Sequence, residues 1–113
     1  MNHHPSLSHL QTLQEYLTLP ADQTYGLVLR NADLRYIELQ TADLSDCDFT
    51  GTDFSSAKIQ WVNFQRLMFK SGSFFQSNLM HAKLNSADFT EAYIVHVHFD
   101  YADLRNAKFA APG

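Results

Sequence analysis

Large apolar residues recur every five residues along most of this chain. From Gly26 the sequence divides into seventeen blocks of five, and the fourth residue of every block is Leu, Ile or Phe. Elsewhere in the same segment only four residues are of these types, namely Leu27, Ile37, Leu67 and Phe75. A single register held over this length indicates an internal repeat, so the pattern predicts a repeat architecture.

The second and third positions of the blocks are also restricted. The second is small in fourteen of the seventeen blocks, and the third is Asp or Asn in eight. A helix would scatter this row around its surface, because five residues turn it by about 140°. A continuous strand would alternate the row between its two faces. A chain that bends once every five residues buries both the large and the small residue. Asp or Asn between them can bond nearby backbone amides at the bend.

Five blocks carry the motif in its clearest form, a small residue followed by Asp and then Leu or Phe. They contain the motifs that start at Ala32, Ala42, Thr52, Ala87 and Ala102. Over residues 26–110 the chain therefore resembles the pentapeptide repeat family. The resemblance implies an all-β solenoid, a right-handed quadrilateral parallel β-helix with four pentapeptides in each coil. Seventeen blocks then make about four coils, in which residues 20 apart stack in filled interior columns.

A short helix is predicted ahead of the repeats, over residues 6–19. Ser8 with Gln11 fits a capping box, and Ser6 is the alternative N-cap. One helical face gathers four leucines, Leu7, Leu10, Leu13 and Leu17. We expect this amphipathic helix to cover the interior of the first coil.

No comparable segment follows Phe109, since residues 110–113 are too short to cover a coil. Either the rod frays there or two rods meet end to end, and some members of the family dimerise through their C-terminal coils. We therefore expect a homodimer, with Phe99, Leu104 and Phe109 as candidate contacts. The expected domains are an N-terminal arm and capping helix over 1–25, the β-helix over 26–110 and a tail over 111–113.

Composition and charge narrow the classes of function. The chain has 113 residues and a net charge of −4, which argues against a direct nucleic-acid binder. No apolar run approaches the roughly 18 residues of a membrane helix, so no membrane partner is expected. Cys47 is the only cysteine, which excludes an internal disulfide and a multi-cysteine zinc site. We expect a cytoplasmic setting.

The sequence offers little catalytic chemistry. It contains no phosphate-binding loop, dinucleotide fingerprint or nucleophile elbow, and no insertion interrupts the repeats to form a pocket. His96 and His98 are expected to be solvated, and His3 and His4 are not expected to hold a metal. Cys47 occupies a small inward position and is interpreted as a core residue. We therefore predict no enzyme, no cofactor and no metal.

The outward positions carry the candidate functional residues. One outward column contains Thr41, Trp61, His81 and Tyr101, and on the preceding face Phe75 and Val95 stack with Tyr93 and His96 close by. Aromatic residues and Met are enriched at interfaces, so we predict a face that binds an unknown protein partner. Its residues are Trp61, Phe75, Met80, His81 and Tyr101. The alternative is that stacked rings only stabilise neighbouring coils.

A second function class comes from the resemblance. Some pentapeptide repeat proteins mimic duplex DNA with a rod of negative charge and bind DNA gyrase or topoisomerase IV, which protects these enzymes from quinolones. Here residues 31–53 are mainly acidic, residues 54–87 hold four bases and no acid, and residues 88–113 are mixed. DNA mimicry needs acids along the whole rod, so it stays the alternative. A structural role beside a secretion or differentiation system is a third, weaker hypothesis.

Overall fold

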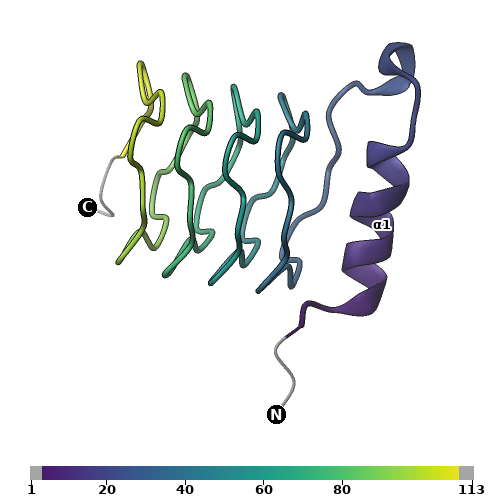
Figure 1. Cartoon of the computed structure of the whole chain (residues 1–113), viewed down its shortest axis with the longest axis horizontal. Coiled ribbons are helices and arrows are strands. Elements are labelled where there is room, and N and C mark those ends of the chain that lie inside the picture. The colour runs from purple at the N-terminus through teal and green to yellow at the C-terminus, as the bar shows by residue number, and fades with distance from the viewer. Residues whose placement is uncertain (1–3, 110–113) are drawn as a thin grey trace.

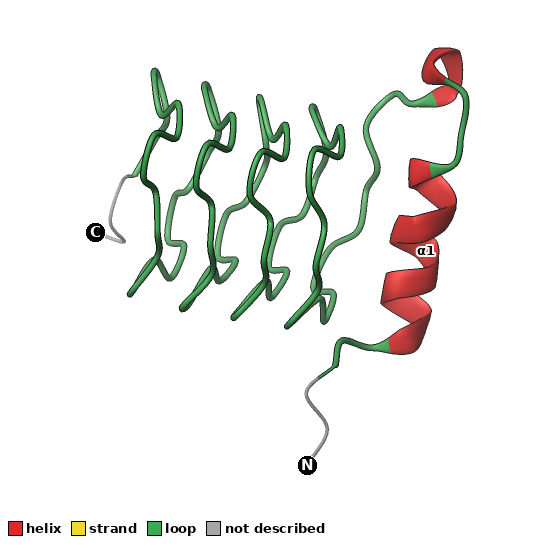
Figure 2. Ribbon diagram, in the orientation of Figure 1, coloured by secondary structure: helices red, strands yellow, loops and turns green. Residues whose placement is uncertain are grey.

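The computed structural model describes residues 4–109 and shows a stack of coils with a helix at one end (Figure 1). Within these residues, parallel bridges join positions 20 apart, from Val28 with Asp48 to Asp88 with Lys108. Every bridging residue is the third of its block, so each side of a coil contributes one. No longer strand forms between residues 4 and 109, and the coils appear as loop throughout (Figure 2). The expected 20-residue register is confirmed.

Hydrogen bonds between coils recur at fixed positions of the blocks, and two of them involve the third position. The N–H of a third-position residue donates to a second-position carbonyl of the preceding coil, as Asp53 does to Ala32 at 2.9 Å. The carbonyl of the same residue accepts from a fourth-position N–H of the preceding coil, as Asp53 does from Leu34 at 2.9 Å. Backbone groups that face a neighbouring coil are satisfied in this way, so each coil holds the next.

Every block begins with a residue in the left-handed region of the backbone. Fifteen of these residues are not glycine and have φ between 55° and 66°, while Gly26 and Gly51 have φ of 104° and 70°. Asn and Asp tolerate this region best, yet Thr41, Trp61 and Tyr101 adopt it too. The corner therefore imposes its conformation on whichever residue stands there, which explains why the sequence shows no residue preference at the first position.

The eight third-position Asp and Asn residues support the corners as expected. Each accepts a hydrogen bond from the backbone N–H two residues later, at 2.8 to 3.3 Å. At Asp88, the Thr90 hydroxyl also donates to the carboxylate, and these bonds hold the pKa of Asp88 below its ordinary value. These side chains thus fix the bend locally, before any packing between coils. They are Asp33, Asp43, Asp48, Asp53, Asn63, Asn78, Asp88 and Asp103.

The fourth-position side chains fill the interior. In the middle of the stack the phenylalanines are fully buried and pack ring against ring, with centroids 4.1 Å apart for Phe69 and Phe74 and 5.5 Å for Phe54 and Phe74. A Cβ built on Gly72 would lie 2.5 Å from the Phe69 ring, so even alanine does not fit at this small position. The core is close-packed, as the filled columns predict.

The predicted N-terminal helix is observed as α1 (Leu7–Leu17), which lies against the first coil and is followed by a 3₁₀ turn at Ala21–Gln23 (Figure 1). Ser6 is the N-cap residue, as in the alternative considered above, although its side chain makes no capping bond. Leu13 and Tyr16 are buried. Among the described residues, no helix has the length and apolar character to cross a membrane.

The prediction that Leu7 shares the buried face is wrong, because its side chain is 71% exposed. At about 100° per residue, Leu10, Leu13 and Leu17 fall on the same side of α1 as Tyr16. Leu7 lies about 60° beyond this arc and faces away from the coil. Tyr16 takes its place in the contact. His3 and the expected tail over 111–113 lie outside the described residues.

Candidate protein-binding face

Three side chains of the predicted face stack on one another along the solenoid. The ring centroids of Trp61 and His81 are 3.9 Å apart with 5° between the planes, and those of His81 and Tyr101 are 4.9 Å apart with 11°. We call these three residues the aromatic ladder. Trp61 is 56% exposed and Tyr101 81% exposed. The ladder arises because the 20-residue register places successive first positions directly above one another.

Phe75 belongs to a second group on the neighbouring corner. Its ring centroid lies 5.8 Å from that of Tyr93 and 6.1 Å from that of His96, which confirms that these three residues are close together. We call them the aromatic cluster. Within residues 4–109, no ring contact is recorded between Phe75 and the ladder. The predicted face is therefore the side of the solenoid that carries Met80, with the ladder at one corner and Phe75 and His96 next to the other, while Tyr93 lies on the adjoining side.

Met80 and Gln60 occupy the position just before the ladder in successive coils. Met80 is half-buried, and its carbonyl accepts the Trp61 N–H at 3.0 Å. The side-chain oxygen of Gln60 is buried and has no hydrogen-bond partner among the residues that the structure describes. A buried acceptor without a partner costs about 1–3 kcal/mol. The sequence pattern did not single out Gln60, because its outward position predicts a solvated amide.

The charge bands of the sequence are joined by ion pairs between coils. Arg66 donates to Asp46 at 2.9 Å, and Lys58 lies 3.2 Å from Glu38, with both pairs 20 residues apart. The Arg66 guanidinium lowers the pKa of Asp46. Three further carboxylates of the described chain are paired with arginine, those of Asp33, Asp48 and Asp103. Paired acids present less net negative charge, so the rod does not carry a continuous acidic stripe.

Cys47 lies beneath α1 and is fully buried, as its interpretation as a core residue requires. Burial raises the pKa of its thiol to about 11, so the thiolate is scarce at neutral pH. The pKa of the adjacent Tyr16 is also raised, chiefly by burial. Between residues 4 and 109, no group of three or more His, Cys, Asp or Glu side chains could hold a metal ion.

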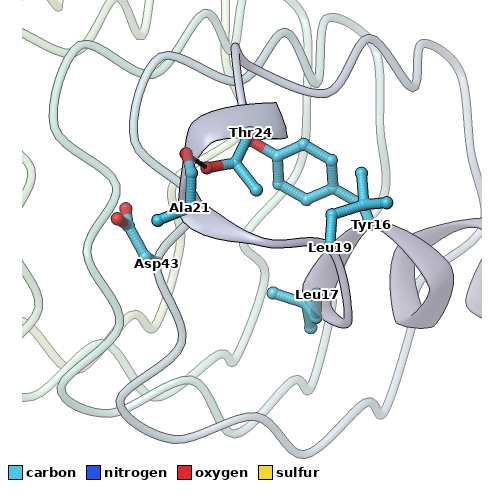
Figure 3. Close-up of a pocket in the computed structure, with 6 residues that line it drawn as sticks. All are labelled: Tyr16, Leu17, Leu19, Ala21, Thr24 and Asp43. Atoms are coloured by element: carbon cyan, nitrogen blue, oxygen red, sulfur yellow. Dashed lines mark hydrogen bonds between the residues drawn. The ribbon is translucent and has the colours of Figure 1, made fainter.

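Two cavities flank α1 rather than the aromatic groups. One of about 200 Å³ lies between the C-terminal half of α1 and the first coil, with Tyr16 and Asp43 in its wall (Figure 3). The other, of about 270 Å³, lies on the N-terminal side and is lined by His4, Gln14 and Glu38 among others. No residue of the ladder or of the cluster lines either cavity.

The 20-residue register of parallel bridges, with a corner in every block of five, defines a parallel β-solenoid. A family model described as pentapeptide repeats matches residues 28–66 and 73–109 in eight copies, and the chain belongs to this family. The membership identifies the solenoid as a right-handed β-helix, as the resemblance to the family implies. Proteins of this family are generally structural or scaffold modules.

Solved structures of the same family resemble the fold. A pentapeptide repeat protein from Nostoc Pcc 7120 is 18% identical, with a TM-score of 0.50 over 100% of this chain and 91% of that one. One from the Arabidopsis thaliana thylakoid lumen is 28% identical, with a TM-score of 0.46 over 65% and 54%. Rfr23 from the cyanobacterium Cyanothece 51142 is 14% identical, with a TM-score of 0.46 over 73% and 63%. This chain thus aligns with less than two thirds of the last two proteins. No curated protein is similar enough in sequence to match.

Proposed function

We propose that the protein is a non-enzymatic binding module that docks another protein on the side of the solenoid between the aromatic cluster and the aromatic ladder. The observation that carries the proposal is the exposure of large rings next to this side: Trp61 is 56% and Tyr101 81% exposed at one corner, and Tyr93, on the adjoining side beyond the other corner, is 55% exposed. The ring edges reach solvent while the coils beneath are close-packed. A rigid surface of this kind loses little conformational entropy when a partner binds.

Capture of partners by the full chain tests the face. The variants Trp61→Ala and Tyr101→Ala each remove one exposed ring of the ladder. Tyr25→Ala is the matched control, because Tyr25 is 86% exposed but precedes the coils. We expect partners that are lost from both ladder variants and retained by the control. Equal retention by all three variants contradicts the proposed face.

The same variants distinguish binding from the alternative that the rings only stabilise the stack. A stacked aromatic pair contributes about 0.5–1.5 kcal/mol beyond its buried area, so Trp61→Ala lowers the free energy of unfolding in either case. Only the binding function also requires loss of the partner at temperatures where the variant is fully folded. Denaturant titration and partner capture on the same samples separate the two roles.

We also propose that two copies meet through the C-terminal coil, in a reducing cytoplasmic setting, with residues 1–25 as arm and cap and 26–110 as the β-helix of about four coils. Support comes from Phe99 and Leu104, which are only partly buried, and from Phe109, which is 50% exposed and stacks on Phe89 at 5.0 Å. The mass in solution tests the contact. We expect a dimer that Phe109→Asp converts to a monomer and that Trp61→Ala leaves intact. A monomeric wild type contradicts it.

The alternative function, a DNA mimic that binds DNA gyrase or topoisomerase IV, is less well supported. Ion pairs such as Asp46 with Arg66 and Glu38 with Lys58 reduce the negative charge that such mimicry requires. This function predicts inhibition of supercoiling that weakens as salt is added, because screening reduces charge recognition. No inhibition by micromolar protein would exclude it.

A further inference from the structure

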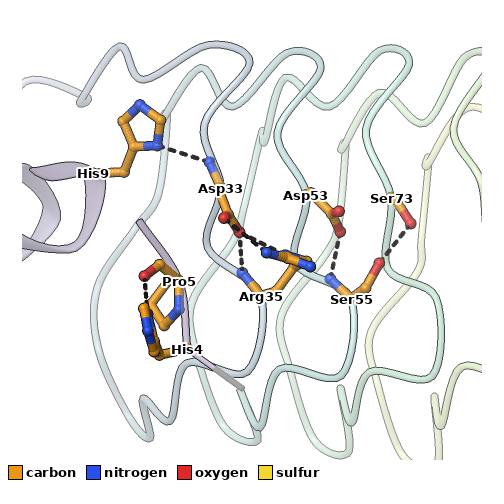
Figure 4. A network of polar contacts seen from close by, with 8 residues as sticks. All are labelled: His4, Pro5, His9, Asp33, Arg35, Asp53, Ser55 and Ser73. Carbon is orange, nitrogen blue, oxygen red and sulfur yellow. Dashed lines mark hydrogen bonds and ion pairs between the residues drawn. The ribbon is translucent and has the colours of Figure 1, made fainter. Parts of the chain in front are cut away.

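The start of the N-terminal segment is bonded to the first coil through the backbone of Asp33, while near the other end of α1 the Gly26 N–H donates to the Tyr16 hydroxyl at 3.1 Å. The Ser6 N–H donates to the Asp33 carbonyl at 3.1 Å. The Asp33 N–H donates to Nδ1 of His9 at 2.9 Å (Figure 4). In later coils the same two backbone groups bond to the preceding coil, as those of Asp53 do to Ala32 and Leu34. Ser6 and His9 thus stand in for a preceding coil at Asp33.

The acceptor of the Asp33 N–H differs chemically from the acceptor of a third-position N–H in later coils. Between coils, the acceptor for a third-position N–H is a backbone carbonyl, which does not take up a proton at any physiological pH. At Asp33 the acceptor is an imidazole nitrogen, which accepts only while it is unprotonated and the ring proton is on Nε2. Imidazole is the side chain whose protonation state changes between pH 5 and 8. A protonated ring has only donors, so it would face the Asp33 N–H with a second N–H.

The charged groups around His9 determine the net effect of its protonation. The Asp33 carboxylate attracts an imidazolium, but its two oxygens already accept from Arg35 Nε and Nη2 at 2.9 and 3.1 Å. Asp53 stacks on Asp33 in the second coil and Arg35 lies between them (Figure 4). On the side of the arm, Nδ1 of His4 is bonded to the Pro5 carbonyl, and the first turn of α1 holds no acid. The carboxylate still attracts a charged ring, but this attraction does not supply a new acceptor for the Asp33 N–H.

We propose that His9 is a pH-sensitive latch, whose protonation releases the start of α1 from the first coil and frees the backbone edge at Asp33. The latch is independent of the aromatic face. It controls access to the N-terminal end of the stack, where the fully buried interior residues Leu34 and Leu44 and the thiol of Cys47 lie. At pH 8 the end is closed, and at pH 5 it opens more often.

Amide hydrogen exchange of the full chain tests the latch. After correction for the intrinsic pH dependence of exchange, we expect protection in α1 and at Asp33 to fall about tenfold from pH 8 to pH 5, the factor that one lost hydrogen bond is worth. Protection in the middle coils should not change. His9→Gln does not titrate and should keep its α1 protection constant over this range, while the control His96→Gln, at an exposed corner, should behave as the wild type.

Two outcomes overturn the proposal. One is equal protection of wild-type α1 at both values of pH, and the other is a fall of the same size in His9→Gln. Should that variant not fold, the backbone amide resonance of Asp33 in the wild type is the second readout. Its chemical shift must move together with the His9 ring resonances during a pH titration, and a shift that stays fixed while the ring titrates rejects the latch.

Discussion

The first coil and the last described coil differ in how completely their interiors are buried. In the first coil, which α1 contacts on its outer side, Ala32, Leu34, Ile37 and Leu44 are buried. Between residues 92 and 109 no interior position reaches that level, and Phe109 is half-exposed. The same five-residue pattern thus gives different burial at the two ends. An inward position becomes core only when a neighbour covers it on each side, so stability is a nearest-neighbour property.

The largest effect is expected for Phe54→Ala when it is compared with Phe99→Ala. Phe54 is fully buried and its ring contacts those of Phe49, Phe64, Phe69 and Phe74. Its loss should lower the free energy of unfolding by about 3–5 kcal/mol, because the cavity cannot collapse. Phe99 is only half-buried, and its loss should cost about 1–2 kcal/mol. Urea titration measures both, and equal losses would break the comparison of the two coils.

A smaller effect is expected at α1, which packs against the first coil. Leu13→Ala removes a fully buried side chain of α1 and should cost about 2–4 kcal/mol. Leu7→Ala, on the same helix but exposed, should change stability by less than about 0.5 kcal/mol. The rate at which a thiol reagent labels Cys47 checks the cause, since only the Leu13 variant should expose that thiol faster. Slow labelling in both variants would show that α1 does not shield Cys47.

The smallest expected effect is the change in folding stability that acidification causes at Asp88. The pKa of Asp88 is lowered by the Thr90 hydroxyl and backbone N–H, so the native state binds its proton less readily than the unfolded chain. The stability from this carboxylate is therefore present above its ordinary pKa of 3.8 and is lost as the pH falls below that value. Asp88→Asn should lose less stability than the wild type between pH 5 and pH 3.

The urea midpoint at pH 5 and pH 3 measures this difference for Asp88→Asn. Asp22→Asn, in the 3₁₀ turn before the coils, is the matched control and should follow the wild type. If the Asp88 variant loses as much stability as the control, the bonds from Thr90 do not stabilise the corner.

Most of the solenoid could be predicted from the sequence, because its forces act at fixed spacing. The apolar period identifies the interior, and Asp or Asn before each large residue identifies the corner bonds, as Asp53 with Ser55 shows. The 20-residue register also places Asp46 against Arg66 in an ion pair. The distribution of charges along the sequence does not show this pair, because the two residues lie in different charge bands. Local chemistry and register together thus specify the coils.

The position of α1 and the binding of a partner depend on contacts that the five-residue repeat does not predict. His9 meets Asp33 across 24 residues, through the angle at which α1 meets the coil. The same angle buries Tyr16 in place of Leu7. The stacked rings of Trp61 and His81 follow from their shared column, but whether a partner covers them depends on a second molecule. A pattern within one chain carries no information on that molecule.

The left-handed corner has a consequence for how this molecule can change. Because the coil sets the backbone at every first position, residues as different as Trp61, Arg66 and Glu91 are accepted there. The interior columns have no such tolerance, as the Phe69 ring against Gly72 shows. The exterior is therefore a lattice of replaceable sites at intervals of about 4.8 Å along the stack. Single substitutions at these positions can therefore change the surface chemistry while the solenoid beneath stays the same.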